Sequence, residues 1–447
     1  MTRPTAESRA GLSARLRGAA LDLTPLRVSR PYRRLLFGEA VSILGTQVTT
    51  VAVPLQVYAQ TRSTVAVGLV GLAGLLPLVL FGLYGGAIAD AVDRRKLVLF
   101  TTCAQLLIAL VLVAQAVAGL GSTLLLYGVV AAQAAMFAID SPARQAFVPR
   151  LLPKELLPSA NALKQVEFNL GVTIGPLLAG ILVARFGYGA AYALDALTFL
   201  AALIAVAGLP AMPPVGGGRR AGTASVLEGL AFLRSRQVLL MTFVVDLVAM
   251  VFAMPRALFP ALSEQVYGGG AQTAGILYSS LAVGALVGAL FSGWLGRIHR
   301  HGVAVLAAIM AWGISVTLFG LTDVLWLAVL CLAAAGLSDM VSAVFRTAIL
   351  QAAAPDEMRG RLGGVFIVVV AGGPRLGDAR AGGGAELIGL QGSSIAGGLA
   401  VVGVTAAIAL GAKNFRAYDA REPQPGGAAE LAAQQTSSSS GTTRSDP

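Results

Sequence analysis

Charged residues are scarce in this chain. Asp, Glu, Lys and Arg make up 12% of the 447 residues, about half of the roughly 25% found in ordinary soluble domains. Hydrophobic residues make up 56%, and they come in runs of about twenty without the polar stripes of a soluble helix or strand. A helix of that length crosses the ~30 Å hydrocarbon layer of a membrane. The composition therefore excludes a soluble multidomain fold and predicts an integral membrane protein in a lipid bilayer.

Cysteine and histidine are even rarer, with two residues of each. Cys103 and Cys331 lie alone in apolar runs, as small buried side chains do, and predict neither a disulfide nor a redox centre. His299 and His301 share one basic loop without other ligands, so no metal site and no cofactor is predicted. The chain has no H-E-x-x-H motif, no phosphate-binding loop and no Ser, His and Asp set, and an enzyme is not expected.

The apolar runs predict an all-α membrane protein with twelve transmembrane helices. A stretch rich in Pro, Gly and Arg, residues 210–237, reads as a linker between two six-helix halves, 35–209 and 238–411. Residues 1–34 form a basic cytoplasmic arm, and residues 412–447 a disordered cytoplasmic tail. The twelve spans are expected near 35–60, 65–89, 97–118, 122–143, 160–184, 188–209, 238–263, 272–296, 302–321, 324–350, 361–386 and 389–411.

Lys and Arg gather at alternate loops between the runs. The opposite loops hold little beyond Arg62 and Arg185. Cytoplasmic loops carry the excess of basic residues, so both termini are predicted to be cytoplasmic. The net charge of +11 is then a matter of topology, because nucleic-acid binding would need the charges on one compact soluble face.

The two halves resemble each other at a fixed offset. A shift of 207 residues places Gly68-Leu-Val on Gly275-Ile-Leu, and Arg144 and Arg346 each lie nine residues before a proline. Duplicated halves are the construction by which many transporters make a central site that rocks between two openings. The repeat therefore favours a transporter.

The loop after the second span reads GAIADAVDRRK, residues 86–96. It resembles the loop motif of the major facilitator superfamily, G-x-x-x-D followed by basic residues, with Asp93 where that family often has glycine. The resemblance implies a cytoplasmic latch that closes in the outward-open state, with Asp90, Arg94 and Arg144 as candidates. The alternative is an ordinary positively charged cytoplasmic loop.

The fifth span contains GVTIGPLLAG, residues 171–180. Gly171, Gly175, Pro176 and Gly180 resemble the glycine and proline pattern of the fifth span in antiporters of that superfamily, which implies export. Glycines permit close helix approach, and proline frees a backbone carbonyl, so the pattern suits a tight, bendable contact between the halves. The alternative is ordinary small-residue packing.

Three further strings resemble the enterobactin-exporter-like bacterial subfamily of the major facilitator superfamily. The resemblance implies a bacterial inner-membrane secondary transporter that exports small amphipathic molecules such as siderophores or drugs, with protons as the coupling ion. Nothing in the sequence demands more than a monomer. An importer or facilitator of a small metabolite on the same fold stays open as the alternative. The strings are PARQAFVP at 142–149, FPAL at 259–262 and PDEMRGR at 355–361.

Five charged side chains are placed at membrane depth, where each costs about 2.5–3.5 kcal/mol unless it is paired or hydrated; Glu167 is placed near the cytoplasmic end. A proton-coupled exporter needs a carboxylate that alternates between its two protonation states, and Asp339 and Asp246 come first for that role. Structural ion pairing is the alternative for each residue, and the mixed signs leave the charge of the substrate undecided. The candidates for proton coupling or substrate binding are Asp339, Asp246, Glu167, Arg256, Arg375 and Asp378.

Overall fold

The computed structural model describes residues 22–213, 228, 231–353, 356–419 and 421, without the side chains at 83, 87, 90 and 356–368. Most of the predicted arm, linker and tail lies outside the described residues, so their roles stay predictions. The described chain forms helices and no strand, as the sequence predicts.

Seven α-helices and one short 3-10 helix belong to the first half. They are α2 (Thr24–Val28), α3 (Arg30–Thr61), α4 (Thr64–Ala91), α5 (Arg94–Val117), α6 (Thr123–Gln145), α7 (Val148–Leu151), η1 (Lys154–Leu156) and α8 (Leu157–Ala207). The second half contains α10 (Gln237–Ala253), η2 (Arg256–Leu258), α11 (Phe259–Gln265), α12 (Gly270–Leu290), η3 (Ser292–Arg297), α13 (His301–Gly320), α14 (Leu325–Ala353), α15 (Asp356–Ile388), α16 (Leu390–Gly411) and α17 (Lys413–Arg416).

Ten helical segments of the described chain are long and apolar enough to cross a membrane. One of them contains α8, whose 51 residues would measure about 77 Å if straight, far more than a bilayer core. At Gly187 the backbone takes φ 76° and ψ 178°, a combination essentially confined to glycine, and α8 turns back there to make two crossings. The predicted number of twelve is reached when the 33-residue helix α15, which is not among the ten, is added.

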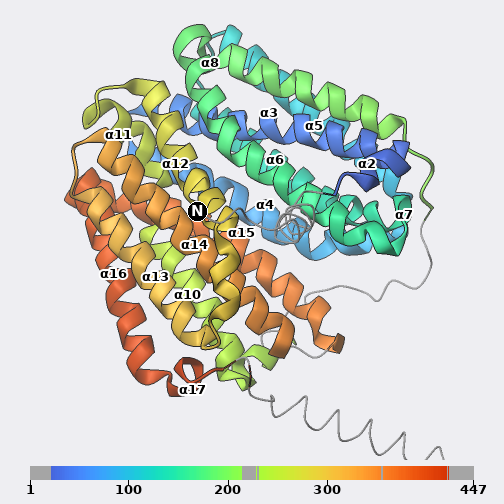
Figure 1. The fold of residues 1–447 in the computed structure, drawn as a ribbon. Coiled ribbons are helices and arrows are strands. Elements are labelled where there is room, and N and C mark those ends of the chain that lie inside the picture. The colour runs from blue at the N-terminus through green and yellow to red at the C-terminus, as the bar shows by residue number, and fades with distance from the viewer. Residues whose placement is uncertain (1–21, 214–227, 229–230, 354–355, 420, 422–447) are drawn as a thin grey trace, which may run out of the picture.

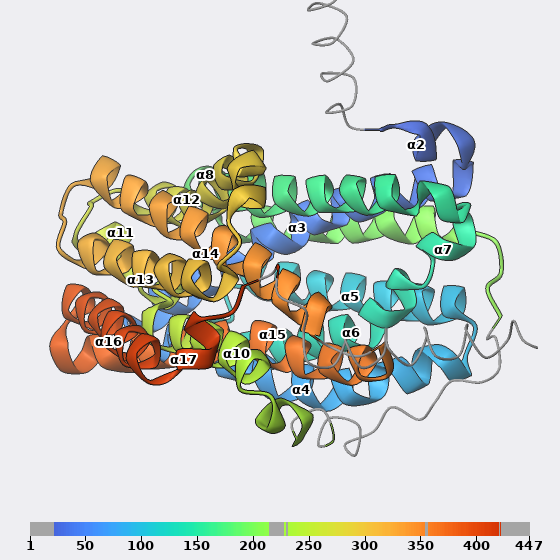
Figure 2. The same cartoon turned by 60° about the horizontal axis from the view of Figure 1, so that its bottom comes forward.

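The two halves form two bundles that are joined at one end (Figure 1). The main contacts between them are α4 with α15 and α8 with α12. We call this the joined end; α3 ends there at Thr61, α8 turns there at Gly187, and α15 ends there at Ile388. The bundles diverge toward their other ends, which carry α7 and α17 (Figures 1 and 2).

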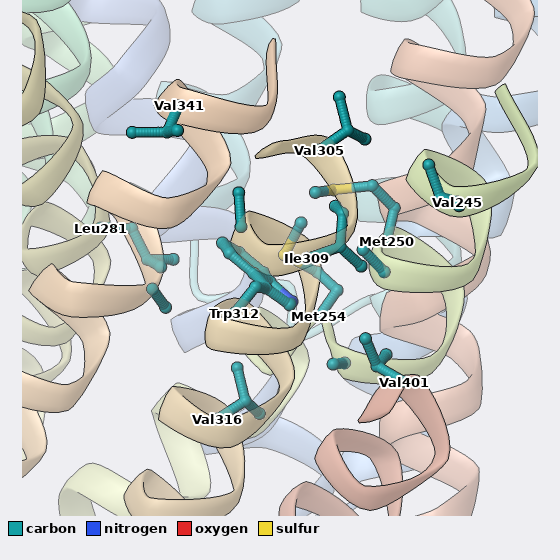
Figure 3. Close-up of a cluster of buried hydrophobic side chains, with 14 of the residues drawn as sticks. Val245, Met250, Met254, Leu281, Val305, Ile309, Trp312, Val316, Val341 and Val401 are labelled. Atoms are coloured by element: carbon teal, nitrogen blue, oxygen red, sulfur yellow. The ribbon is translucent and has the colours of Figure 1, made fainter. Parts of the chain in front are cut away.

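Each bundle has its own apolar core, and Figure 3 shows part of the second one. Trp312 and Ile309 of α13 are 3% and 1% exposed and pack with Met250 of α10 and with Met254, which directly follows α10. The outer faces carry exposed large hydrophobic side chains, for example Leu197 at 63% and Ile204 at 68%. Such faces suit contact with lipid, because lipid tails are as apolar as these side chains.

Glycines bring α12 and α14 into backbone contact. A Cβ on Gly284 would lie 1.8 Å from the carbonyl oxygen of Ala333, and one on Gly336 would lie 1.9 Å from that of Leu281. We expect Gly284→Ala to lower the free energy of unfolding by about 1–3 kcal/mol, because the methyl group overpacks this contact. Circular dichroism of the detergent-solubilised protein during chemical unfolding measures the change. Gly403→Ala is the control, since no atom lies within 4 Å of its Cβ position; equal stability of the two variants would contradict the prediction.

Candidate functional site at the contact of the two halves

The seventh span, predicted as continuous over 238–263, is broken near its middle. Helix α10 ends at Ala253, and Met254 is extended with ψ 112°, as a residue before proline tends to be. Pro255 follows, and the short helix η2 begins at Arg256 before α11 resumes the span. Arg256 is exposed at this break. Broken spans are where transporters commonly place their binding groups.

Four side chains from three elements meet around this break. Asp378 of α15 accepts the backbone N–H of Ala257 and interacts electrostatically with Arg256 and Arg375. The Tyr278 hydroxyl of α12 donates to the carbonyl oxygen of Arg256 at 3.0 Å. The spacing of Arg375 and Asp378 suggested a pair along the helix, but the structure gives no ion pair between these two described residues. Instead, Arg375 Nη1 and Asp378 Oδ1 are buried atoms without a hydrogen-bond partner in the described chain.

This group lies against the first half through a row of glycines on α4. A Cβ on Gly68 would lie 2.7 Å from the carbonyl oxygen of Asp378, and one on Gly71 would lie 2.9 Å from that of Arg375. The Arg375 Nε atom lies 3.4 Å from the Cβ position of Gly74. Since η2 also contacts α4, the charged group lies at the boundary between the two halves.

A second charged cluster lies within the second half, on α10 and α14. Arg346 forms an ion pair with Asp246, and its Nη2 atom lies 3.5 Å from Asp339 Oδ1. The Asp246 side chain is 5% exposed, whereas that of Asp339 is 39% exposed. Arg346 therefore interacts with two carboxylates, and only one of them, that of Asp339, is substantially exposed.

The first half contains a matching cluster on α3, α6 and α8. Arg144 pairs with Asp140, lies 3.5 Å from Glu39 and donates to the Thr102 hydroxyl at 2.8 Å. Lys164 Nζ lies 3.2 Å from the other oxygen of Glu39. Four charged groups thus neutralise one another inside one bundle.

The two clusters are related by the internal repeat. Glu39 on the first span and Asp246 on the seventh are separated by 207 residues, the offset of the repeat, and each pairs with the arginine near the end of α6 or α14. Glu167 lies near the first cluster and interacts electrostatically with Glu39 and Lys164. Its Oε2 atom is buried without a hydrogen-bond partner among the described residues.

The glycine and proline pattern of the fifth span lies between two neighbours. Cβ atoms on Gly171 and Gly175 would lie 2.6 Å from Ile43 and 2.4 Å from Gln47, both on α3 of the same half. A Cβ on Gly180 would instead lie 2.7 Å from the carbonyl oxygen of Ala271 on α12 of the other half. The reciprocal position is Gly275, whose Cβ would lie 2.5 Å from the carbonyl oxygen of Pro176. The end of the pattern therefore belongs to the contact between the halves.

Polar contacts complete the joined end. Arg62, which takes a left-handed conformation with φ 55°, forms an ion pair with Glu264. The Gln265 amide donates to the Tyr58 hydroxyl at 2.5 Å. Ser63 donates to Glu386 at 2.7 Å, and Thr64 donates to the Gly382 carbonyl at 2.9 Å. Each of these bonds joins one half to the other.

Known proteins share this sequence pattern over most of its length. A family model described as a transmembrane secretion effector matches residues 20–441. The enterobactin exporter EntS of Citrobacter koseri is 32% identical over 415 residues, which cover 91% of this chain and 98% of the exporter. The chain belongs to the transmembrane secretion effector family of the major facilitator superfamily. The enterobactin exporter EntS of Escherichia coli O1:K1 is also 32% identical, over 86% of this chain and 92% of the exporter.

Solved structures show that the fold is that of the superfamily. The nucleoside transporter NupG superposes with a TM-score of 0.70 at 11% identity, over 87% of this chain and 100% of NupG. A bacterial homologue of the iron transporter ferroportin, crystallised in an inward-facing state, gives a TM-score of 0.64 at 15% identity, over 87% and 99%. The predicted all-α membrane fold of the superfamily is confirmed, and the protein is a multi-pass membrane transporter.

The loop motif of the superfamily lies between α4 and α5 in this transporter. Asp90 is in the last turn of α4, and its side chain lies outside the described residues. Asp93 caps α5 by accepting the backbone N–H of Lys96 at 3.1 Å, and its other oxygen accepts the N–H of Met212 at 3.0 Å. The Arg94 N–H donates to the Met212 carbonyl at 3.1 Å. Asp93, which departs from the family glycine, thus ties the loop to the chain that leaves α8.

Three charged residues that interact inside this transporter are not among the site residues predicted from the sequence. Glu39 and Asp195 are expected from sequence to lie near a membrane interface, but Asp195 is 0% exposed inside the first bundle and accepts the Thr49 hydroxyl at 2.6 Å. Arg380, absent from the predicted set, donates to the Ser393 carbonyl of α16 at 3.1 Å. The 207-residue offset of the repeat relates Glu39 to Asp246 and could have identified Glu39 from the sequence. Asp195 and Arg380 meet their partners only in the folded protein, so no sequence pattern identifies them.

Proposed function

We propose that this transporter is a proton-coupled exporter of small amphipathic molecules of the siderophore or drug type in the bacterial inner membrane. The substrate class is supported by the similarity to enterobactin exporters over nearly the whole of both chains. The direction is supported by the antiporter-like pattern of the fifth span, whose end at Pro176 and Gly180 lies at a contact between the halves.

The shared arginine of the second half carries the proton-coupling part of the proposal. Arg346 can neutralise one of its two carboxylates, Asp246 and Asp339, and the second must either remain charged at a cost or bind a proton. Asp246 is buried in the ion pair, whereas Asp339 is partly accessible. Asp339 is therefore the group that exchanges its proton as the surroundings change.

The arrangement of the contacts between the halves supports alternating access. The glycine contacts and hydrogen bonds described above hold the halves together at the joined end. The short helices α2, α7 and α17 lie toward the diverging end (Figures 1 and 2), and the positive-inside rule predicts that the end with the basic loops is cytoplasmic. On this proposal the structure corresponds to the inward-facing member of the cycle, and export requires the joined end to open toward the outside.

Inside-out vesicles with an imposed proton gradient and a pH-sensitive dye test this function. A panel of siderophores and amphipathic drugs is added, and we expect at least one compound to dissipate the gradient with the native protein. Asp339→Asn keeps the size of the side chain but cannot release a proton, so dissipation should fall to the level of vesicles without the protein.

Asp323→Asn is the matched control, because Asp323 is an exposed loop carboxylate outside the cluster and should leave dissipation unchanged. Accumulation of a compound that persists in full without any gradient would overturn proton coupling in favour of facilitated diffusion. Equal dissipation by Asp339→Asn and the native protein would remove Asp339 from the coupling role.

A further inference from the structure

Charged side chains at membrane depth lie both inside the bundles and at the boundary between the halves. Within the bundles, Arg346 is opposed by two carboxylates, and Arg144 and Lys164 by Glu39, Asp140 and Glu167. At the boundary, Arg256 and Arg375 both interact electrostatically with Asp378. Arg256 also interacts electrostatically with Asp339. The boundary therefore brings two guanidinium groups to one place in the membrane interior.

The two arginines at the boundary have unused hydrogen-bonding capacity. Arg256 is exposed at the break of the seventh span, and Arg375 Nη1 is buried without a partner among the described residues. A buried donor without an acceptor is costly, and such groups in a native protein usually await a water, an ion or a ligand. Gly74, which has no side chain, leaves the room beside Arg375 Nε.

One partly exposed aromatic ring, that of Tyr278, lies at the same place, and the fully buried ring of Phe259 packs behind it. Tyr278 is held by its hydrogen bond to the Arg256 carbonyl, and its ring meets that of Phe259 edge to face with centroids 4.9 Å apart. Both rings come from the half that carries the arginines. Guanidinium groups recognise planar oxygen anions by paired hydrogen bonds, and aromatic rings give an apolar surface for the remainder of such a molecule.

We propose that Arg256 and Arg375 bind an ionised carboxylate of the transported molecule, so that the substrate is an organic acid. This inference rests on the proposed transport function and specifies its substrate class. Asp378 interacts electrostatically with both guanidinium groups, and the substrate anion supplies an acceptor for Arg375 Nη1. The location at the boundary of the halves lets the site face either side in turn.

Binding to the purified full-length protein in lipid nanodiscs tests the site without any gradient. Isothermal titration compares three aromatic acids, 2,3-dihydroxybenzoate, salicylate and benzoate, each with its methyl ester. We expect each acid that binds to do so roughly tenfold or more tightly than its ester, because charge-assisted hydrogen bonds are lost with the charge. Arg256→Gln and Arg375→Gln should each remove most of that preference.

Two further variants, Arg375→Lys and Arg185→Gln, serve as controls for this binding experiment. The lysine keeps the charge but not the paired hydrogen bonds, so acid preference should be intermediate. Arg185 is exposed beside the turn of α8, and its replacement should change nothing. If Arg375→Gln does not fold, the exposed Arg256 still reports on the site. No acid preference in the native protein, or full preference in both glutamine variants, would overturn the inference.

The vesicle assay separates this inference from the proposed function. Acid binding that depends on the arginines, together with no dissipation of the gradient by any compound, would reject proton-coupled export and keep the site. Dissipation by neutral or cationic compounds that is unchanged in Arg375→Gln would reject the acid site and keep the function.

Discussion

Leucine in place of Gly180 is expected to push apart α8 and α12 and to shift the transporter toward a state that is open at the joined end. A Cβ at this position would lie 2.7 Å from the carbonyl oxygen of Ala271, so a larger side chain fits only if α12 moves away. Overpacking of this kind costs about 1–3 kcal/mol, which corresponds to a roughly 5- to 150-fold shift between two states.

The shift is measured by labelling a cysteine at the break of the seventh span. Arg256→Cys provides the reporter, and both native cysteines, Cys103 and Cys331, are replaced by serine. A membrane-impermeant maleimide is added to intact cells. Labelling from outside should be slow in the parent, in which the joined end is closed, and faster in Gly180→Leu.

Two other glycines show whether the effect belongs to the contact between the halves. A Cβ on Gly171 would meet Ile43 of the same half at 2.6 Å, so Gly171→Leu should lower stability without faster labelling from outside. Gly128 has no atom within 4 Å of its Cβ position, so Gly128→Leu should change neither. Labelling of Gly180→Leu at the rate of Gly128→Leu would show that α8 and α12 do not hold this side closed.

The sequence predicts the spans well because the bilayer sets their length. Apolar runs of about twenty residues have few alternatives to spanning helices in a membrane, and the predicted boundaries near 35–60 and 389–411 agree with α3 and α16. The helix α15 is the weakest case, since Arg375, Asp378 and Arg380 interrupt its apolar character, and its position depends on partners in other helices.

The sequence predicts the site less well because its contacts are made between distant residues. Asp195 lies 146 residues from Thr49, to which it is hydrogen-bonded, and no local pattern connects them. The spacing of Arg375 and Asp378 suggests a pair on one helix, but Asp378 instead binds the backbone of η2. The break that exposes that backbone had a signal, because Pro255 lies inside an apolar run and prolines there interrupt helices.

Methionine in place of Arg346 is expected to destabilise the second half strongly. The substitution keeps most of the apolar length of the side chain but leaves Asp246, which is 5% exposed, without its cation and Asp339 without its nearest one. Breaking a buried pair by removing one partner costs about 3–5 kcal/mol, mainly because the remaining charge stays buried. Thermal unfolding of the detergent-solubilised protein measures the loss.

The size of this effect depends on whether Asp246 is ionised, and a second substitution decides that. Asp246→Asn in the Arg346→Met background removes the uncompensated charge, so most of the lost stability should return. The repeat-related Arg144→Met should leave Glu39 partly compensated, because Lys164 remains 3.2 Å from it, whereas the buried Asp140 loses its ion pair. If Arg346→Met were as stable as the native protein, Asp246 and Asp339 would both already be protonated in the folded state. Asp339 could then bind no further proton, which would contradict its proposed role in proton coupling.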